Sequence, residues 1–370
     1  MSAAEFRIFL DNEPVDPLQV DAVRDIRVDQ AVGMATEAEL RLEIAADEAG
    51  DWPDIEQDLA QPFSRIRIEV KIGNGDFVEL VDGPVIAQRV ELSASPDRSS
   101  LVVVAHDDSV LLNQDEQIEL YEDLAAHEIA ERLFRDHGLT PEVDSTPGVN
   151  GALSRYVVRR GTAMQMLREL ARRHGMFVYV RPGATPGSSI GVFARPDLTP
   201  GDLPELLLMG RDRNVNSFNL EYNALRAFTA RADSLRISDK RILTADSTAS
   251  DLAALGDTPV HDMVPPGRSL LSRTREEEGD LDAATAAAVN HSSWAYSATA
   301  ETAADIYPAV LSPHNVVRVA GGGGSLGGDY LISQVVHHID DENYKQQVTL
   351  RRNARSNGAA GASPAAAGVF

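Results

Sequence analysis

The chain has 370 residues, no cysteine and a formal charge of −23 at pH 7. This length suits two or three domains, and the missing cysteines exclude disulfides, thiolate nucleophiles and cysteine-based zinc sites. A strong negative field repels phosphates, which argues against sequence-independent binding of nucleic acid over the whole surface. A local basic patch stays open around the stretches RYVVRRG and LRELARRHG.

The first residues, MSAAEFRIFLDNEP, have neither the basic region nor the apolar region of a signal peptide. No apolar run approaches the ~18 residues that a membrane span needs. We therefore expect a chain that is made in the cytoplasm and has no membrane span. As a separate expectation, the chain has no cofactor.

Residues 1–112 are predicted to form a series of strands. In EAELRLEIA, apolar and charged residues alternate, which places Ala38, Leu40, Leu42 and Ile44 on one face and Glu37, Glu39, Arg41 and Glu43 on the other. SRIRIEVKI alternates in the same way, and Asn74-Gly75 after it is a hairpin signal. Many short strands with turns between them indicate an antiparallel barrel or sandwich.

A first helix is predicted in EDLAAHEIAERLFRDHG. Its apolar stripe consists of Ala126, Ile129, Ala130, Leu133 and Phe134. Asp123 is the expected N-cap, and Gly138 is expected just past the end of the helix.

A second helix is predicted in GTAMQMLRELARRHG. Thr162 and Gln165 have the spacing of a capping box, and Gly175 is expected to end the helix. Its apolar stripe consists of Ala163, Met166, Leu167, Leu170 and Ala171, and the stripes of both helices are expected to face a core. The strands MFVYVR and SIGVFAR follow, so residues 113–205 are predicted to be an α+β unit.

Strand character returns at NVNSFNLEYNALRAFTARADS. Residues 241–305 are mixed and rich in alanine, with a helix predicted at DLDAATAAAVNHSSWAY. Strands resume at HNVVRVA and end with residue 352. The low-complexity end after that is predicted to be disordered.

The stretch DYLISQVVHHIDDENYKQQVTLRR has the composition of a metal site, with His337, His338, Asp340, Asp341 and Glu342 close together. Successive side chains of a strand point to opposite faces, so the two adjacent histidines do not easily share one metal. The acids fall where a turn between two alternating strands is expected. We therefore interpret the stretch as a β-hairpin.

Other candidate sites also have structural explanations. His137 and His174 each lie in the last turn of a predicted helix, where a positive charge is favourable. The glycine run at 321–328 lacks the Gly-Lys-Ser/Thr ending of a phosphate loop and is interpreted as a hairpin connection. The acids in EEEGDLD, residues 276–282, suit a helix start better than a calcium loop. We predict no catalytic, cofactor-binding or metal-binding residue.

Four stretches together resemble the hub family of contractile tails, which includes phage late control D proteins, the myophage baseplate hub and the N-terminal part of VgrG. LVDGPVIAQRVELSASPDRSSLVVVAHDDSVLL is similar to the strands that close the first barrel of that family. DLAAHEIAERLFRDHGLTPEV and RYVVRRGTAMQMLRELARRHGMFVYV are similar to its two helices, although many members have Phe-Leu where this chain has Met166-Leu167. GDYLISQVVHHIDDENYKQQVTLRR is similar to its terminal hairpin.

The resemblance implies a mainly β fold with α+β insertions, in which an α+β domain separates two tandem antiparallel β-barrels of the tail-tube type. The expected parts are a first barrel (1–112), the α+β domain (113–205), a second barrel (206–240 and 306–353), a mixed insertion with a helix (241–305) and a disordered tail (354–370).

The resemblance also implies a non-enzymatic homotrimer. Three chains with two barrels each give a pseudo-sixfold ring that joins a hexameric inner tube to a trimeric spike. Because the end of the chain is too short for a spike, we expect a separate spike protein, together with an inner tube or tube-initiator protein and baseplate wedge proteins. The expected location is a phage tail or a phage-tail-like particle, and the residues at the interfaces are not assigned.

Two other functions stay open. One is a secreted or cell-wall-acting hydrolase that uses His337 or His338, although the missing signal peptide argues against it. The other is a carbohydrate-binding module, for which the two tryptophans of the chain are few.

Overall fold

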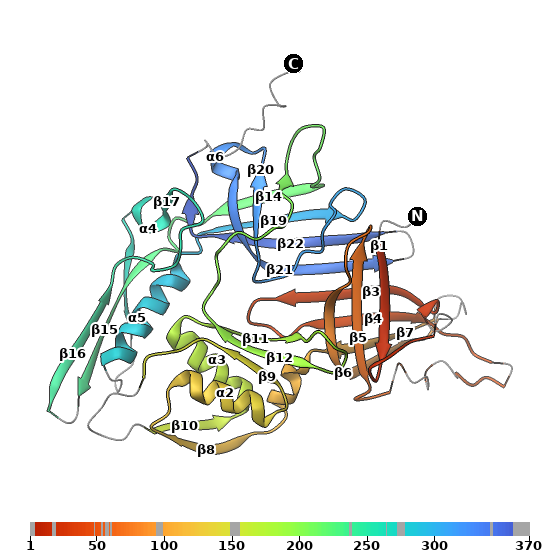
Figure 1. The fold of residues 1–370 in the computed structure, drawn as a ribbon, viewed down its shortest axis with the longest axis horizontal. Helices are drawn as coiled ribbons and strands as arrows, with labels where there is room; N and C mark the ends of the chain where they lie inside the picture. The colour runs from red at the N-terminus through yellow and green to blue at the C-terminus, as the bar shows by residue number, and fades with distance from the viewer. Residues whose placement is uncertain are drawn as a thin grey trace.

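The computed structural model of the chain describes residues 4–16, 20–47, 49–52, 55, 59, 61–93, 99–148, 156–236, 239–263, 265–271, 278–340 and 343–357. The fold is mainly β, with one large, mostly antiparallel sheet and several smaller sheets and helices around it (Figure 1). This confirms the predicted fold class. Among the described residues, no helix is both long enough and apolar enough to cross a membrane.

The first seven strands build one half of the large sheet. They are β1 Ala4–Leu10, β2 Glu13–Pro14, β3 Val23–Ala31, β4 Glu37–Glu43, β5 Arg65–Ile72, β6 Val78–Glu91 and β7 Ser100–His106, and they pair in the order β3-β4-β7-β6-β5-β1-β2. Ala38, Leu40 and Leu42 of β4 are buried, as their alternation predicts. The pairing of β5 with β6 confirms the hairpin that Asn74-Gly75 predicts.

The other half of the large sheet comes mainly from the C-terminal part of the chain. Its strands are β13 Leu206–Leu207, β14 Ser217–Tyr222, β19 Tyr296–Ala303, β20 Val316–Ala320, β21 Gly328–Asp340 and β22 Tyr344–Arg352. They pair in the order β14-β19-β22-β21, while β20 also pairs with β21 and β13 with β20. The glycine run contains one helical turn, α6 Gly323–Leu326, within the predicted β20–β21 hairpin connection.

The two halves are joined edge to edge by β21 and β3. Their antiparallel pairing extends from Gln334↔Ala31 to Asp340↔Asp25. The sheet therefore continues from one half into the other without a break. In the described residues the main run of pairings is an open path from β14 to β2, so closure of either half into a barrel stays a prediction.

Two helices packed between two small sheets follow β7 (Figure 1). The elements are the 3-10 helix η4 Asp108–Asn113, β8 Gln117–Glu122, α2 Ala126–Asp136, β9 Thr140–Val143, β10 Tyr156–Gly161, α3 Ala163–His174, β11 Phe177–Pro182 and β12 Ser189–Ala194. β8 pairs with β10 on one side of the helices, and the sheet β11-β12-β9 lies on the other side. The two predicted apolar stripes share one core with Tyr121 and Phe193.

The ends of both helices follow from local sequence. In α3, the Thr162 hydroxyl accepts a hydrogen bond from the Gln165 amide at 3.2 Å, and the Gln165 side chain accepts one from the Thr162 amide at 3.1 Å, which confirms the capping box. Gly175 ends α3 in the left-handed conformation. The prediction that Asp123 caps α2 is wrong, because the chain still turns at Asp123, with φ of +55°, and the N-cap is Ala125.

A further sheet and helix lie beside the second half of the large sheet (Figure 1). The elements are β15 Phe228–Arg236, β16 Arg241–Ser247, β17 Thr258–Pro259, α4 Val260–Met263, β18 Gly267–Leu271, α5 Glu278–Ser292 and β23 Ala354–Arg355. β15 pairs with both β16 and β18, and α5 packs against β15, β16 and α3. The predicted helix at DLDAATAAAVNHSSWAY is confirmed as part of α5.

Three strands differ from the predicted division. β15, expected in the second barrel, belongs to the smaller sheet, whereas β19, expected within the insertion 241–305, lies between β14 and β22. Ala354–Arg355, expected to be disordered, form β23 on β17, and Ala354 is completely buried. The sheet to which a strand belongs is decided by partners far away in sequence, which local periodicity does not specify. Residues 358–370 of the predicted tail lie outside the described residues.

Candidate assembly interface

One face of the large sheet is mainly polar across both halves, although Val102 and Val104 of β7 and Val336 of β21 also lie on it. Alternation along the paired strands places on this face Asp25, Arg27 and Asp29 of β3, Glu37, Glu39, Arg41 and Glu43 of β4, Ser297, Thr299 and Glu301 of β19, Gln334 and His338 of β21, and Lys345, Gln347, Thr349 and Arg351 of β22. The opposite face carries the two apolar cores. Since β21 pairs with β3, the polar face is continuous between the halves.

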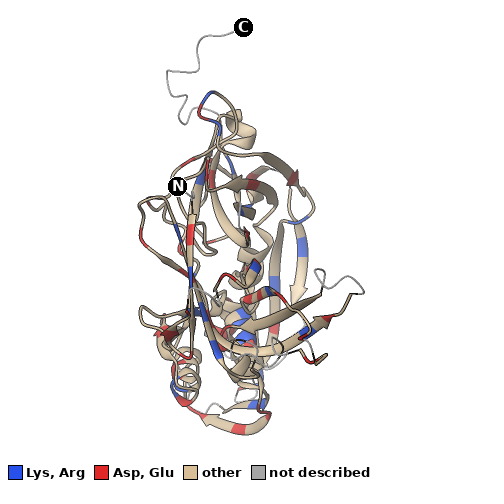
Figure 2. Cartoon of the chain, turned by 90° about the vertical axis from the view of Figure 1, so that its right-hand side faces the viewer, with Lys and Arg blue, Asp and Glu red and all other residues tan. Residues whose placement is uncertain are grey.

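Acids and bases are interleaved on this polar face. Arg24 pairs with Glu43 at 3.0 Å, and Arg41 pairs with Glu91 of β6 at 3.4 Å. The two halves are also linked directly, because the Gln334 amide donates to the Asp29 carboxylate at 2.8 Å. Figure 2 shows both charge signs spread along the strands. Exposed ion pairs of this kind each stabilise a fold by ~1 kcal/mol or less, so they contribute little to the stability of the chain.

The terminal hairpin places His337 in the core. The His337 side chain is completely buried, with Nδ1 2.8 Å from the Tyr344 hydroxyl and Nε2 3.2 Å from the Gln30 side-chain oxygen. Burial and the nearby charge of His338 lower the pKa of His337 to about 3. His337 is therefore a neutral, hydrogen-bonded core residue where β21 and β3 meet.

His338 and the acids of the hairpin do not join His337. His338 pairs across the sheet with Lys345 and Arg27, on the opposite, polar face. Asp340 forms the turn with Asn343: its carboxylate accepts from the Asn343 amide at 2.7 Å, and its amide donates to the Asn343 carbonyl at 3.0 Å. The predicted hairpin is confirmed, and Asp341 and Glu342 lie outside the described residues.

The other candidate residues take the structural positions expected of them. His137 caps the end of α2, with Nδ1 2.8 Å from the Leu133 carbonyl oxygen, and His174 is the last residue of α3. Glu278 begins α5, while Glu276 and Glu277 lie outside the described residues. Within the described part of the chain, no three His, Asp or Glu side chains are grouped as a metal site.

The sequence prediction missed a buried ion cluster between the first β half and the α+β unit. Arg67 and Glu69 of β5 are 1% and 3% exposed, although strand alternation with an apolar core predicts that they face water. Arg67 binds Glu69 at 2.6 Å and Asp82 at 3.1 Å. The second face of β5 is therefore also buried, and a charged residue can occupy it only when it is paired.

The same cluster ties the first β half to the turn between β11 and β12. Asp82 accepts from the Gly187 amide at 3.0 Å, and Arg67 donates to the Gly183 carbonyl at 2.8 Å. Arg65 bridges Asp82 at 2.6 Å and Asp108 at 2.7 Å. Burial alone would lower the pKa of Arg65, but these two carboxylates raise it above its ordinary value. The cluster thus fixes the orientation of the α+β unit on the first half.

A model of the family described as Alg8 N-terminal domain matches residues 3–341. No curated protein matches the chain in sequence. Among solved structures, the 43 kDa tail protein of prophage MuSo2 from Shewanella oneidensis is 13% identical, with a TM-score of 0.62, and 95% of this chain and 98% of that chain are covered.

Two further solved structures have the same fold. A tail protein from Neisseria meningitidis MC58 is 10% identical with a TM-score of 0.60, and covers 95% of this chain and 97% of its own. An E. coli component of the type VI secretion system, described as similar in structure to the T4 bacteriophage tail proteins gp27 and gp5, is 12% identical. Its TM-score is 0.54, over 94% of this chain and 76% of that one. At these identities the likeness establishes the fold.

Proposed function

Because the chain belongs to the Alg8 N-terminal domain family and has the fold of solved tail proteins, we propose that it is a structural hub of a contractile tail or injection system. Three copies would form a ring in which each chain supplies two β units. Such a ring presents six similar units to a hexameric inner tube and threefold symmetry to a trimeric spike. As a hub of this kind, the chain would be related to late control D proteins and to the N-terminal part of VgrG.

The observation that carries this proposal is the edge-to-edge joining of two β units. Each unit has its own apolar core, and β21 and β3 merge the units into one sheet with a continuous polar face. The proposed domains keep the predicted division, except that β15 moves to the insertion and β19 to the second β unit. A chain of this kind supplies two neighbouring positions of a sixfold ring as one rigid piece.

We assign the polar face to the central channel. On the strands of the first unit, acids outnumber arginines: Asp25, Asp29, Glu37, Glu39, Glu43 and Glu91 against Arg24, Arg27, Arg41 and Arg89. The part of the wall that the first unit supplies would therefore repel acidic cargo or DNA, whereas Lys345 and Arg351 of β22 place positive charges on the part that the second unit supplies. The role proposed here is non-enzymatic. Of the two histidines that the hydrolase alternative would use, His337 is buried in the core, whereas His338 lies on the polar face.

The proposed partners are two further copies of the chain, a separate spike protein, an inner tube or tube-initiator protein and baseplate wedge proteins. The chain would reside in the assembled tail particle. Sedimentation of the purified full chain over a range of concentrations tests whether three copies of the chain associate. We expect a reversible monomer–trimer equilibrium. A chain that stays monomeric, alone and in the particle, contradicts the proposal.

A further inference from the structure

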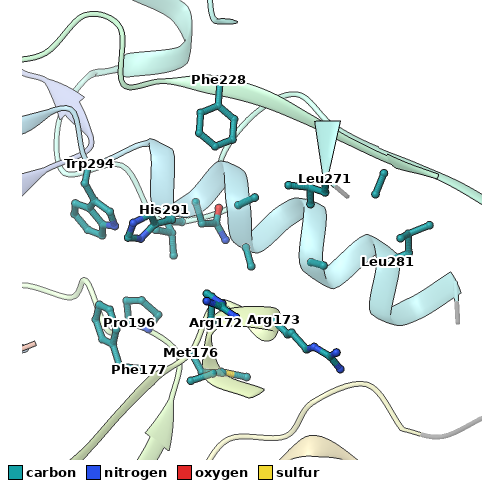
Figure 3. Close-up of a pocket in the computed structure, with 18 residues that line it drawn as sticks. Arg172, Arg173, Met176, Phe177, Pro196, Phe228, Leu271, Leu281, His291 and Trp294 are labelled. Carbon is teal, nitrogen blue, oxygen red and sulfur yellow. The ribbon is translucent and has the colours of Figure 1, made fainter. Parts of the chain in front are cut away.

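An apolar pocket lies between the α+β unit and the insertion. Its volume is about 440 Å³, within the range of ligand-binding pockets. Its walls are formed by the end of α3, by α5 and by β15 and β18, and Figure 3 shows Phe177, Met176 and Pro196 on one side and Phe228, Leu271 and Leu281 on the other. Trp294 and His291 close one end.

The rim of this pocket is positively charged, which is unusual for a chain with a net charge of −23. Arg172, Arg173 and His291 line the pocket. The pocket wall and the charges of Arg226 and Arg351 lower the pKa of His291, so these two arginines lie close to it. Among the described residues, no ion pair involves Arg172, Arg226 or Arg351. Of the groups that line the pocket, His291 is mostly neutral at pH 7 because its pKa is lowered, and Arg173 pairs with Glu169 at 3.5 Å. The rim charge that an acidic partner can neutralise therefore comes mainly from Arg172, Arg226 and Arg351.

An acidic segment with exposed apolar side chains lies on the ribbon formed by β8 and β10. Ile118 and Leu120 of β8 are 84% and 57% exposed, and Tyr156 and Val158 of β10 beside them are 56% and 42% exposed. Glu116, just before β8, and Glu122, at its end, are both exposed and flank this apolar pair, while the exposed Arg160 of β10 lies across from Ile118. In the described residues β8 pairs only with β10, so its other edge is open. Contiguous exposed apolar side chains of this kind mark an interaction surface.

We propose that β8 of one copy docks in the pocket of the next copy, with Ile118 and Leu120 in the apolar space and Glu116 and Glu122 against the basic rim. The inference rests on the proposed trimer and assigns its subunit contact. The two surfaces are different parts of the chain, so the contact is head-to-tail, and such contacts close into a ring when the rotation between copies fits. The complementary charge and the apolar match both belong to this chain, which favours a second copy over any other occupant.

Site-specific cross-linking of the full chain tests this contact, because the chain has no native cysteine. The variant carries Leu120→Cys on β8 and Ala288→Cys in the pocket wall, and a short bis-maleimide is added to the purified protein and to assembled particles. We expect a covalent species of three chains under denaturing conditions. Each single-cysteine variant should give at most two chains.

A second variant, Ile118→Asp with Leu120→Asp, should reduce the sedimenting mass from three chains to one while the circular dichroism spectrum is kept. The matched control is Ile242→Asp, which alters a side chain that is 73% exposed on β16 but belongs to neither surface, and should leave the trimer intact. A trimer without a pair-specific cross-link, or a cross-link within one chain, overturns this contact and leaves the proposed function standing. Absence of any trimer in the solution and in the particle overturns the proposed function itself.

Discussion

At the scale of single residues, His337 is the clearest case of a side chain whose role changed with the structure. Strand periodicity could predict that His337 and His338 point to opposite faces, and this was confirmed. Periodicity could not predict which face is buried, because Gln30, whose side-chain oxygen accepts from Nε2 of the imidazole, comes from a strand 307 residues earlier. The pH dependence of folding follows from that burial.

The chain should lose stability as the pH falls below about 6.5. The pKa of His337 is lowered to about 3, and burial lowers that of His314, which stacks on Tyr179, to about 4, from an ordinary value of 6.5. Below pH 6.5 the unfolded chain binds protons that the folded chain excludes. The free energy of unfolding therefore falls by roughly 1.4 kcal/mol per pH unit for each histidine, down to pH 4 for His314 and pH 3 for His337.

The variant His337→Gln should flatten part of that slope. Glutamine can still bond to Tyr344 and Gln30 but does not titrate. Urea unfolding at pH 7, 6, 5 and 4.5 measures the slope in both proteins. An unchanged slope in the variant would show that His337 is not neutral in the folded chain.

At the scale of elements, the helices α2, α3 and α5 and the terminal hairpin were predictable, because capping residues and periodicity are local signals. The buried ion cluster was not predictable in this way. Arg67 and Glu69 alternate with apolar residues as on an exposed strand face. They are buried because the turn between β11 and β12 packs over them. The sheets of β15 and β19 were misassigned for the same reason: long-range packing decides them.

The variant Asp82→Asn should destabilise the fold by about 3–5 kcal/mol, because it leaves Arg65 and Arg67 with less charge compensation in a buried site. Asp82 has no exposed side-chain surface and contacts both arginines and the Gly187 amide. Chemical unfolding measures this loss. The matched control, Glu91→Gln, breaks the exposed pair with Arg41 and should cost ~1 kcal/mol or less. Equal effects of the two variants would contradict the account of the cluster.

At the scale of the whole molecule, the sequence predicts strands, an α+β unit, strands, an insertion and strands, and the mainly β fold class is confirmed. What the sequence could not supply is the pairing of β21 with β3, since neither strand contains a signal for the other. That pairing creates one polar face from two units. It is the feature on which the proposed ring depends.

Electron microscopy of the assembled particle tests the ring most directly. The account predicts three copies of the chain around an open channel between the tube and the spike, with the polar strand face of β3, β4, β21 and β22 toward the lumen. A different copy number, a closed channel, or a lumen lined by another face of the sheet would contradict it.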